Sequence, residues 1–144
     1  MSTALARQFR ELVGFYSNLQ RRHIHDQGLP PQVRLLILLR NLGPVTQSEL
    51  GRVAGLEKSW VSRVVDRFVE NGLVKRVPLT SDRRCLQINL TPAGSKQAKQ
   101  VDVLLTDYVI RLLGDIPDDA QPALIDALTV LTQALHKKSD TGEV

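Results

Sequence analysis

Residues 46–72 read TQSELGRVAGLEKSWVSRVVDRFVENG, and this stretch decides the fold. Thr46 and Glu49 stand three positions apart, the spacing of a capping box in which two side chains satisfy free backbone N–H groups at a helix start. The pattern predicts a short helix that runs to about Ala54. Gly55 and Leu56 then make a brief turn into the next helix, so two helices joined by a tight turn are expected.

The second helix of the stretch separates its apolar and polar residues onto two faces. Asn71-Gly72 ends it, because glycine tolerates the left-handed conformation that follows many helices. The apolar stripe is expected to pack inward and the polar face to lie free. The stripe consists of Val61, Val64, Val65, Phe68 and Val69, and the opposite face of Ser59, Ser62, Arg63, Asp66 and Arg67.

Two short runs of strand-forming residues follow, Leu73–Val77 and Cys85–Leu90. A polar turn that includes Pro78 and Asp82 separates them, so they are expected to form a hairpin. A helix, a tight turn, a second helix and a hairpin, in this order, make the winged helix-turn-helix plan. The predicted fold is mainly α with a small β-hairpin wing.

The polar helix face and the hairpin tip are the candidate DNA-binding residues. On this plan the second helix is free to enter a major groove, where arginine pairs with guanine edges and serine bonds phosphate or base. Arginine on a thin ribbon suits the narrow, negative minor groove. A solvated helix face and a charged turn are the alternatives, which the order of the flanking elements disfavours. The candidates are Lys58, Ser59, Trp60, Ser62, Arg63 and Arg67 on the helix, and Asp82, Arg83 and Arg84 at the tip, where Asp82 is expected to orient Arg84 through a charge-assisted hydrogen bond.

Helices are also predicted on both sides of this core. A first helix is expected from about Thr3 to His25, and a second, largely buried one from Pro31 to Leu42. After the hairpin, Thr91-Pro92 starts a long helix, and a last helix begins at Asp118 and Asp119, with a frayed tail from Ser139. The apolar stripes are Leu5, Phe9, Leu12, Tyr16, Leu19 and His23 in the first helix, Ala98, Val101, Leu105, Tyr108 and Leu112 in the long helix, and Leu124, Ala127, Leu128, Leu131 and Leu135 in the last.

The chain resembles the MarR family of bacterial winged helix-turn-helix transcription regulators. The match rests on Asp82-Arg83-Arg84 at the hairpin, Leu90-Thr91 and Gly94 behind it, and two runs in and after the second helix, 62–67 and 72–74. Each piece alone is weak, and the combination is specific. The resemblance covers the whole chain and implies a single domain over 1–144, with a DNA-binding lobe at about 31–90 and dimerisation helices at about 3–25 and 92–137.

The resemblance implies a homodimer, and the sequence supports it independently, because one small lobe cannot cover three amphipathic helices. Family members commonly repress transcription and release DNA when a small aromatic or phenolic ligand enters a crevice beside the dimer helices, or when a cysteine is oxidised. The candidates for lining such a crevice are Tyr16, His23, His25 and Arg34, although Tyr16 and His23 also lie on the core stripe.

The composition limits the other classes of protein to which the chain could belong. The chain has 144 residues, of which 24% are charged and 42% hydrophobic. The sequence predicts neither a membrane-spanning helix nor a secretory signal, so a cytoplasmic protein is expected. Residues 1–84 hold 14 basic and 7 acidic groups, a net charge of +7, whereas 85–144 hold 5 and 8, a net of −3, which together give the total of +4. A basic front half is typical of a protein with a polyanion partner, but scattered surface lysines and arginines are the alternative, and charge alone does not separate the two. The winged helix-turn-helix plan is what indicates double-stranded DNA as the partner.

No cofactor or metal is expected. The lone Cys85 is interpreted as an ordinary strand residue, since oxidant sensors of the family carry the cysteine in the first helix. His23 and His25 point in different directions on a helix and do not make a metal pair.

The sequence therefore predicts a sequence-specific DNA-binding regulator, a repressor acting as a homodimer on a pseudo-palindromic operator. A winged-helix protein-interaction module is the alternative, but it would not need arginines on both groove-facing elements. An enzyme is the weakest reading, because no nucleophile with a base, carboxylate pair or phosphate loop is assembled.

Overall fold

The computed structural model describes residues 1–142, and the chain divides into two compact units, Met1–Leu105 and Thr106–Val144. The helices and strands, in chain order, are α1 (Thr3–Asp26), η1 (Pro31–Val33), α2 (Arg34–Leu42), β1 (Val45–Thr46), α3 (Gln47–Ala54), α4 (Lys58–Glu70), β2 (Val74–Pro78), β3 (Leu86–Leu90), α5 (Pro92–Leu112), η2 (Asp118–Ala120) and α6 (Gln121–Thr141).

The helix boundaries follow from local signals in the sequence. The predicted capping box is formed, because the Glu49 amide donates to Thr46 Oγ1 and the Thr46 amide donates to Glu49 Oε2, both at 3.2 Å. Gly55 ends α3 in the left-handed conformation, with φ of 66°, and turns the chain toward α4. Two helices joined by this short turn form the predicted helix-turn-helix.

The first unit is built around a core that joins α2, α3, α4 and the sheet. Leu36, Leu50, Val61 and Val65 are fully buried in it. The inward stripe predicted for α4 is correct at four positions and wrong at Val69, which is 38% exposed near the end of the helix. The buried members of this core are Leu35, Leu36, Leu39, Leu50, Val61, Val64, Val65, Phe68, Val74, Ile88 and Ala98.

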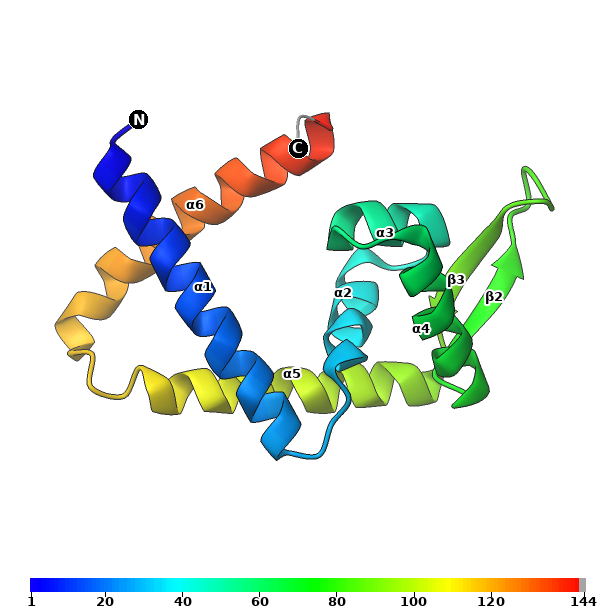
Figure 1. The fold of residues 1–144 in the computed structure, drawn as a ribbon, viewed down its shortest axis with the longest axis horizontal. Helices are drawn as coiled ribbons and strands as arrows, with labels where there is room; N and C mark the ends of the chain where they lie inside the picture. The colour runs from blue at the N-terminus through cyan, green and yellow to red at the C-terminus, as the bar shows by residue number, and fades with distance from the viewer. Residues whose placement is uncertain (143–144) are drawn as a thin grey trace. The chain divides into compact units, whose positions relative to one another are not determined.

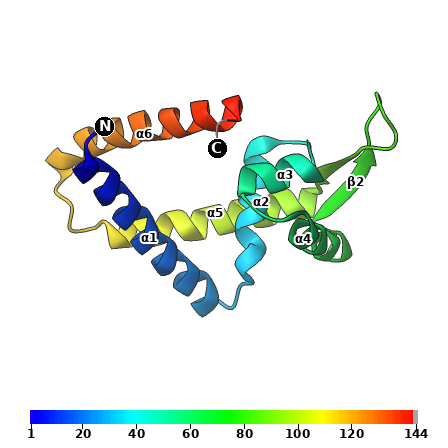
Figure 2. The same cartoon turned by 45° about the horizontal axis from the view of Figure 1, so that its top comes forward.

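The described strands form one antiparallel sheet in the order β1-β3-β2, and its β2–β3 hairpin projects beyond α4 (Figures 1 and 2). The hairpin pairs Val74 with Leu90 and Pro78 with Leu86. The strand β1 was not predicted from the sequence. Its two residues, Val45 and Thr46, pair with Ile88 and Gln87, and so attach the start of α3 to the hairpin.

A smaller cluster in the same unit joins the end of α1, η1 and the middle of α5. It contains Ile24, Val33, Val101 and Leu105. Ile24, which lies outside the predicted α1 stripe, is the buried residue of this helix. No residue of the predicted stripe is buried within the chain: Leu5 and Leu12 are 46% and 57% exposed, while Tyr16 and His23 are half-buried.

The second unit contains the end of α5, η2 and α6, and none of the described α6 residues is buried. The predicted fraying from Ser139 is wrong as far as Thr141, because these residues continue α6; the last two residues of the predicted tail lie outside the described part of the chain. Among residues 1–142, no helix is both long enough and apolar enough to cross a lipid bilayer.

Candidate nucleic-acid interface

The helix α4 presents a polar face because its apolar stripe is turned into the core. Lys58, Ser59, Arg63 and Arg67 are exposed, and Ser62 is half-buried. Its buried stripe fixes the rotation of the helix about its axis, so these side chains share the face that points away from the lobe. The structure therefore brings together five of the six candidate residues that the sequence places on this helix.

Trp60, the sixth candidate, is turned partly toward the core. It is half-buried and packs against the first core cluster. A ring that packs on the core has less of its surface available to a partner. Trp60 thus contributes to holding the helix as well as to its surface.

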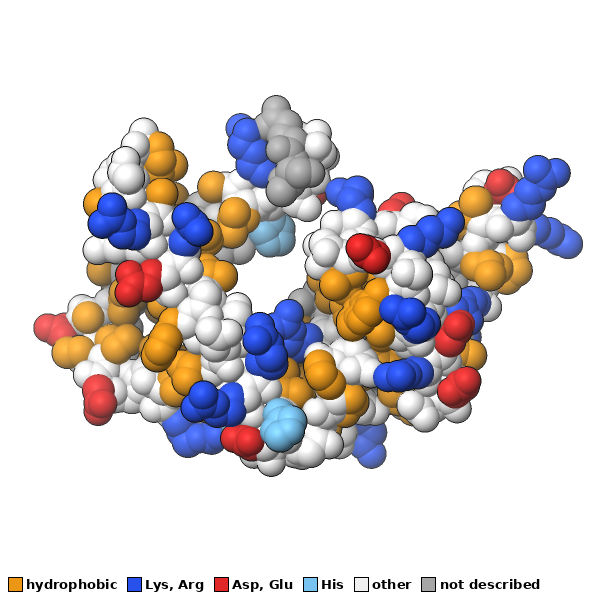
Figure 3. Space-filling view, in the orientation of Figure 1, with side chains coloured by type: hydrophobic (Ala, Val, Ile, Leu, Met, Phe, Trp, Pro, Cys, Tyr) orange, Lys and Arg blue, Asp and Glu red, His pale blue; other side chains and the backbone are white. Residues whose placement is uncertain are grey.

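The tip of the hairpin is a closed turn. The Leu79 amide donates to the Cys85 carbonyl at 2.9 Å, and the Cys85 amide donates to the Asp82 carbonyl at 3.1 Å. Arg83 and Arg84 lie exposed within this turn, and Figure 3 shows Lys and Arg side chains gathered at the end of the hairpin. A constrained turn carrying two cations is suited to an anionic partner.

Asp82 holds the turn through both oxygens of its carboxylate. Oδ1 accepts the backbone N–H of Arg84 at 3.0 Å, and the Cys85 thiol lies 3.8 Å from Oδ2 as a donor. The hydrogen bond expected between Asp82 and Arg84 is thus made to the main chain. Asp82 acts on the backbone from which the arginine side chain extends.

One polar cluster beneath this surface was missed by sequence reasoning. Arg76 of β2 donates to Asp66 of α4 and to Gln47 of α3. The signal was available in the strand, because Arg76 stands two residues after the buried Val74 and therefore shares its inward face. A charged residue at an inward strand position indicates a specific partner.

The predicted effector residues separate into two places. Tyr16 and Arg34 are joined through Gln20, whose Nε2 donates to Tyr16 Oη and whose Oε1 accepts from Arg34 Nη1, both at 2.9 Å. His25 instead lies 3.5 Å from Asp26 and lines a groove of about 590 Å³. The residues that line this groove are Asn18, Arg21, Arg22, Ile24, His25, Leu29 and Pro31.

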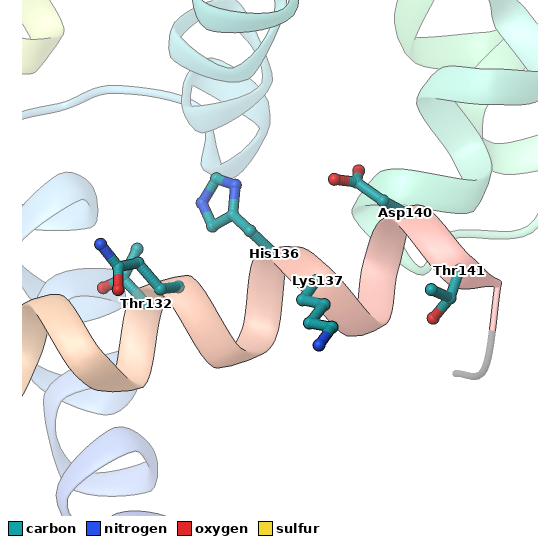
Figure 4. A pocket seen from close by; sticks show the side chains of 6 residues that line it. Thr132, His136, Lys137, Asp140 and Thr141 are labelled. Atoms are coloured by element: carbon teal, nitrogen blue, oxygen red, sulfur yellow. The ribbon is translucent and has the colours of Figure 1, made fainter.

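A second hollow lies along α6 and is lined by that helix alone (Figure 4). Its side chains come from successive turns, among them Thr132, His136 and Asp140, so nothing in the lining encloses a ligand. Within residues 1–142 no group of three or more His, Cys, Asp or Glu side chains is placed to hold a metal ion.

Comparison with known proteins agrees with this geometry. The MarR family model matches residues 30–86. An uncharacterised HTH-type transcriptional regulator, YdgG of Bacillus subtilis (strain 168), is 30% identical over 114 residues, which are 78% of this chain and 74% of YdgG.

Two solved structures extend the likeness over most of the chain. A MarR family transcriptional regulator from Silicibacter pomeroyi is 28% identical, with a TM-score of 0.75 over 94% of this chain and 90% of its own. A mutant MarR from E. coli complexed with operator DNA has the same fold, with 23% identity and a TM-score of 0.65 over 90% and 94% of the two chains.

The exposed α4 face, the closed wing and the tight turn before α4 define a winged helix-turn-helix transcription regulator. The chain belongs to the MarR family.

Proposed function

We propose that the chain is a homodimeric, sequence-specific repressor that reads a pseudo-palindromic operator and leaves it when a small aromatic or phenolic effector binds. The observation that carries the proposal is the exposure of cationic side chains on both elements that project from one lobe. These residues are Lys58, Arg63 and Arg67 on α4, and Arg83 and Arg84 at the wing tip.

The major groove is the proposed site for α4. An α-helix fits this groove, and arginine there pairs with the O6 and N7 atoms of guanine. Arg63 is the proposed base reader because it lies near the middle of the exposed face, one turn from Ser59 and from Arg67. A mutant MarR from E. coli with the same fold has been solved in complex with operator DNA, which supports operator DNA as the partner of this fold.

The minor groove is the proposed site for the wing. The tip is thin and carries Arg83 and Arg84 side by side, and a narrow minor groove attracts arginine through its negative potential. Asp82 is part of the proposed site, because its carboxylate fixes the backbone of Arg84.

A second copy of the chain is the proposed cover for the exposed apolar side chains of the terminal helices. Phe15 on α1, Ile110 on α5 and Ile125 on α6 are each exposed by 60% or more. Soluble monomers seldom leave so many large apolar side chains in water. A two-fold dimer would present two α4 helices to half-sites about one helical turn of DNA apart, which is the reason to expect a palindrome.

The effector is proposed to bind near the Tyr16–Gln20–Arg34 chain of hydrogen bonds. His23 lies on the same helix α1, whereas His25 lines the separate groove. A phenol or carboxylate on an aromatic ring can replace Gln20 as the partner of the Arg34 guanidinium. This chain of bonds joins α1 to α2, so a ligand that breaks it alters how the two helices are held. Release from the operator by such a ligand is what a regulated repressor requires.

Selection of bound sequences from random duplex DNA tests the proposal. The full chain is expected to recover a palindrome, to bind it far more tightly than random duplex, and to lose affinity steeply as salt is raised, because phosphate contacts release counterions. The Arg63→Ala/Arg67→Ala variant is the matched control and should select no motif. Equal affinity of the unaltered chain for all duplexes would favour the protein-interaction module instead.

A further inference from the structure

An arginine inside the lobe ties three elements together. Arg76 Nη2 donates to Asp66 Oδ1 at 2.5 Å and to Gln47 Oε1 at 3.5 Å. Arg76 lies on β2, Asp66 lies on α4, and Gln47 is the first residue of α3. One guanidinium group carried by the wing strand β2 thus contacts both helices of the helix-turn-helix.

The position of Arg76 is unusual for a charged residue. It follows Val74 by two residues on β2 and lies opposite the buried Ile88 of β3, and its side chain is 27% exposed. An apolar residue is the usual occupant of such a site, because an arginine there loses much of its hydration. Part-buried ion pairs add little net stability when compared with apolar replacements. The pair is therefore better explained by the geometry that it imposes.

Asp66 of α4 is the acidic partner of Arg76. It lies on the polar side of α4, next to Arg67 and one turn after Arg63, where an unpaired carboxylate would repel DNA phosphates. Its side chain is 55% exposed, so solvent alone would satisfy it. The bond to Arg76 pairs the carboxylate with a positive charge carried by the wing strand.

Phe68 of α4 and Val74 of β2 also belong to one apolar core cluster, so the two elements share apolar packing beside the ion pair. Apolar contacts are non-directional and tolerate small sliding and rotation. A hydrogen-bonded ion pair is directional and is lost when α4 turns or slides relative to the wing.

We propose that Arg76 is a positioning residue that fixes α4 relative to the wing, and so sets the spacing between major-groove and minor-groove contacts on the operator. The inference rests on the proposed function, since it assigns a role in operator reading. It adds a residue that contacts no DNA but determines how two DNA-contacting elements act together.

The test compares Arg76→Met with Lys75→Met. Lys75 is the neighbouring residue on β2, is exposed and faces the other side of the strand, so its loss removes one positive charge and leaves the ion pair intact. Sequence selection from random duplexes is carried out with the full chain and with each variant. We expect the Lys75→Met variant to select the wild-type DNA motif. We expect the Arg76→Met variant to bind the operator at least tenfold more weakly. In the sequences that it selects, the base preferences at the centre and at the flanks of the motif should no longer stand at a fixed spacing.

Asp66→Asn tests the same contact from its exposed partner, where folding is least at risk. Removal of a negative charge near DNA should tighten binding if only net charge matters, whereas the proposal expects the same loss of spacing as in Arg76→Met. In a double-mutant cycle the combined variant should bind about as well as either single one, because both remove one contact. Arg76→Lys should restore part of the spacing.

The outcomes separate this inference from the proposed function. A wild-type motif that Arg76→Met or Asp66→Asn leaves unchanged, or losses that add in the double variant, would overturn the positioning role alone. A wild-type chain that selects no motif would overturn the proposed function and this inference with it.

Discussion

A Cβ atom on Gly94 would overlap the carbonyl oxygen of Leu73 and would lie 2.8 Å from its carbonyl carbon. Thr91 strengthens the same junction, because its amide donates to the Leu73 carbonyl at 3.0 Å and its hydroxyl to the Gly72 carbonyl at 2.6 Å. The same hydroxyl accepts the Gly94 amide and caps α5. The start of α5 is therefore held directly against the turn where α4 ends.

Replacement of Gly94 by alanine is expected to destabilise the protein by on the order of 3 kcal/mol, because backbone rather than a flexible side chain blocks the added methyl group. Gly14 is the matched control: it also lies inside a helix, and nothing stands within 4 Å of its added Cβ. Gly14→Ala should stabilise the protein by about 1 kcal/mol through helix propensity. Urea unfolding measures both, and equal effects of the two substitutions would contradict the close approach.

Asp82→Ala is expected to weaken operator binding although it removes a negative charge beside DNA. The reason is that the Arg84 amide loses its acceptor and the wing turn loosens. Asp82→Asn separates the two effects, because an amide oxygen still accepts the N–H while the charge is gone. Titration of labelled operator measures affinity. If Asp82→Ala binds more tightly while it stays folded and dimeric, the ordering role is wrong.

Arg63→Ala and Arg84→Ala are expected to change different parts of the operator preference. Loss of Arg63 should cost about 1 to 3 kcal/mol of binding if it pairs with guanine, and should relax the preference at that base. Loss of Arg84 should change preference only at the flanks, where minor-groove width is read. Sequence selection with each variant distinguishes them, and identical changes would contradict separate docking sites.

Ile125→Glu is expected to dissociate the dimer, because it introduces a charge among the exposed apolar side chains of α6. Gln133→Glu, an exposed polar position of the same helix, adds the same charge and should leave assembly unchanged. Sedimentation at micromolar concentration measures both variants, and circular dichroism checks their helicity. A monomeric wild-type chain with intact helicity would remove the basis for two-fold operator recognition.

Local sequence signals account for most of the fold. The capping pair Thr46–Glu49, the left-handed turn at Gly55 and the cap at Thr91 act over three or four residues, so each can be found in the sequence without a partner from elsewhere. The period of the α4 stripe likewise defines its outward face. The candidate residues on that face were predictable for the same reason.

Contacts between distant residues were decided by the tertiary structure. The two-residue strand β1 exists only because Val45 meets Ile88, and no periodicity is visible in so short a segment. The exposure of Val69 and the half-burial of Trp60 depend on where neighbouring elements end, which a helical repeat does not encode. The Arg76 ion pair joins residues from three elements and becomes recognisable as a positioning contact once β2 is placed beside α4. Short-range hydrogen bonding and side-chain periodicity were thus enough to predict the elements and their outward faces, whereas contacts between residues far apart in the chain depend on how those elements pack.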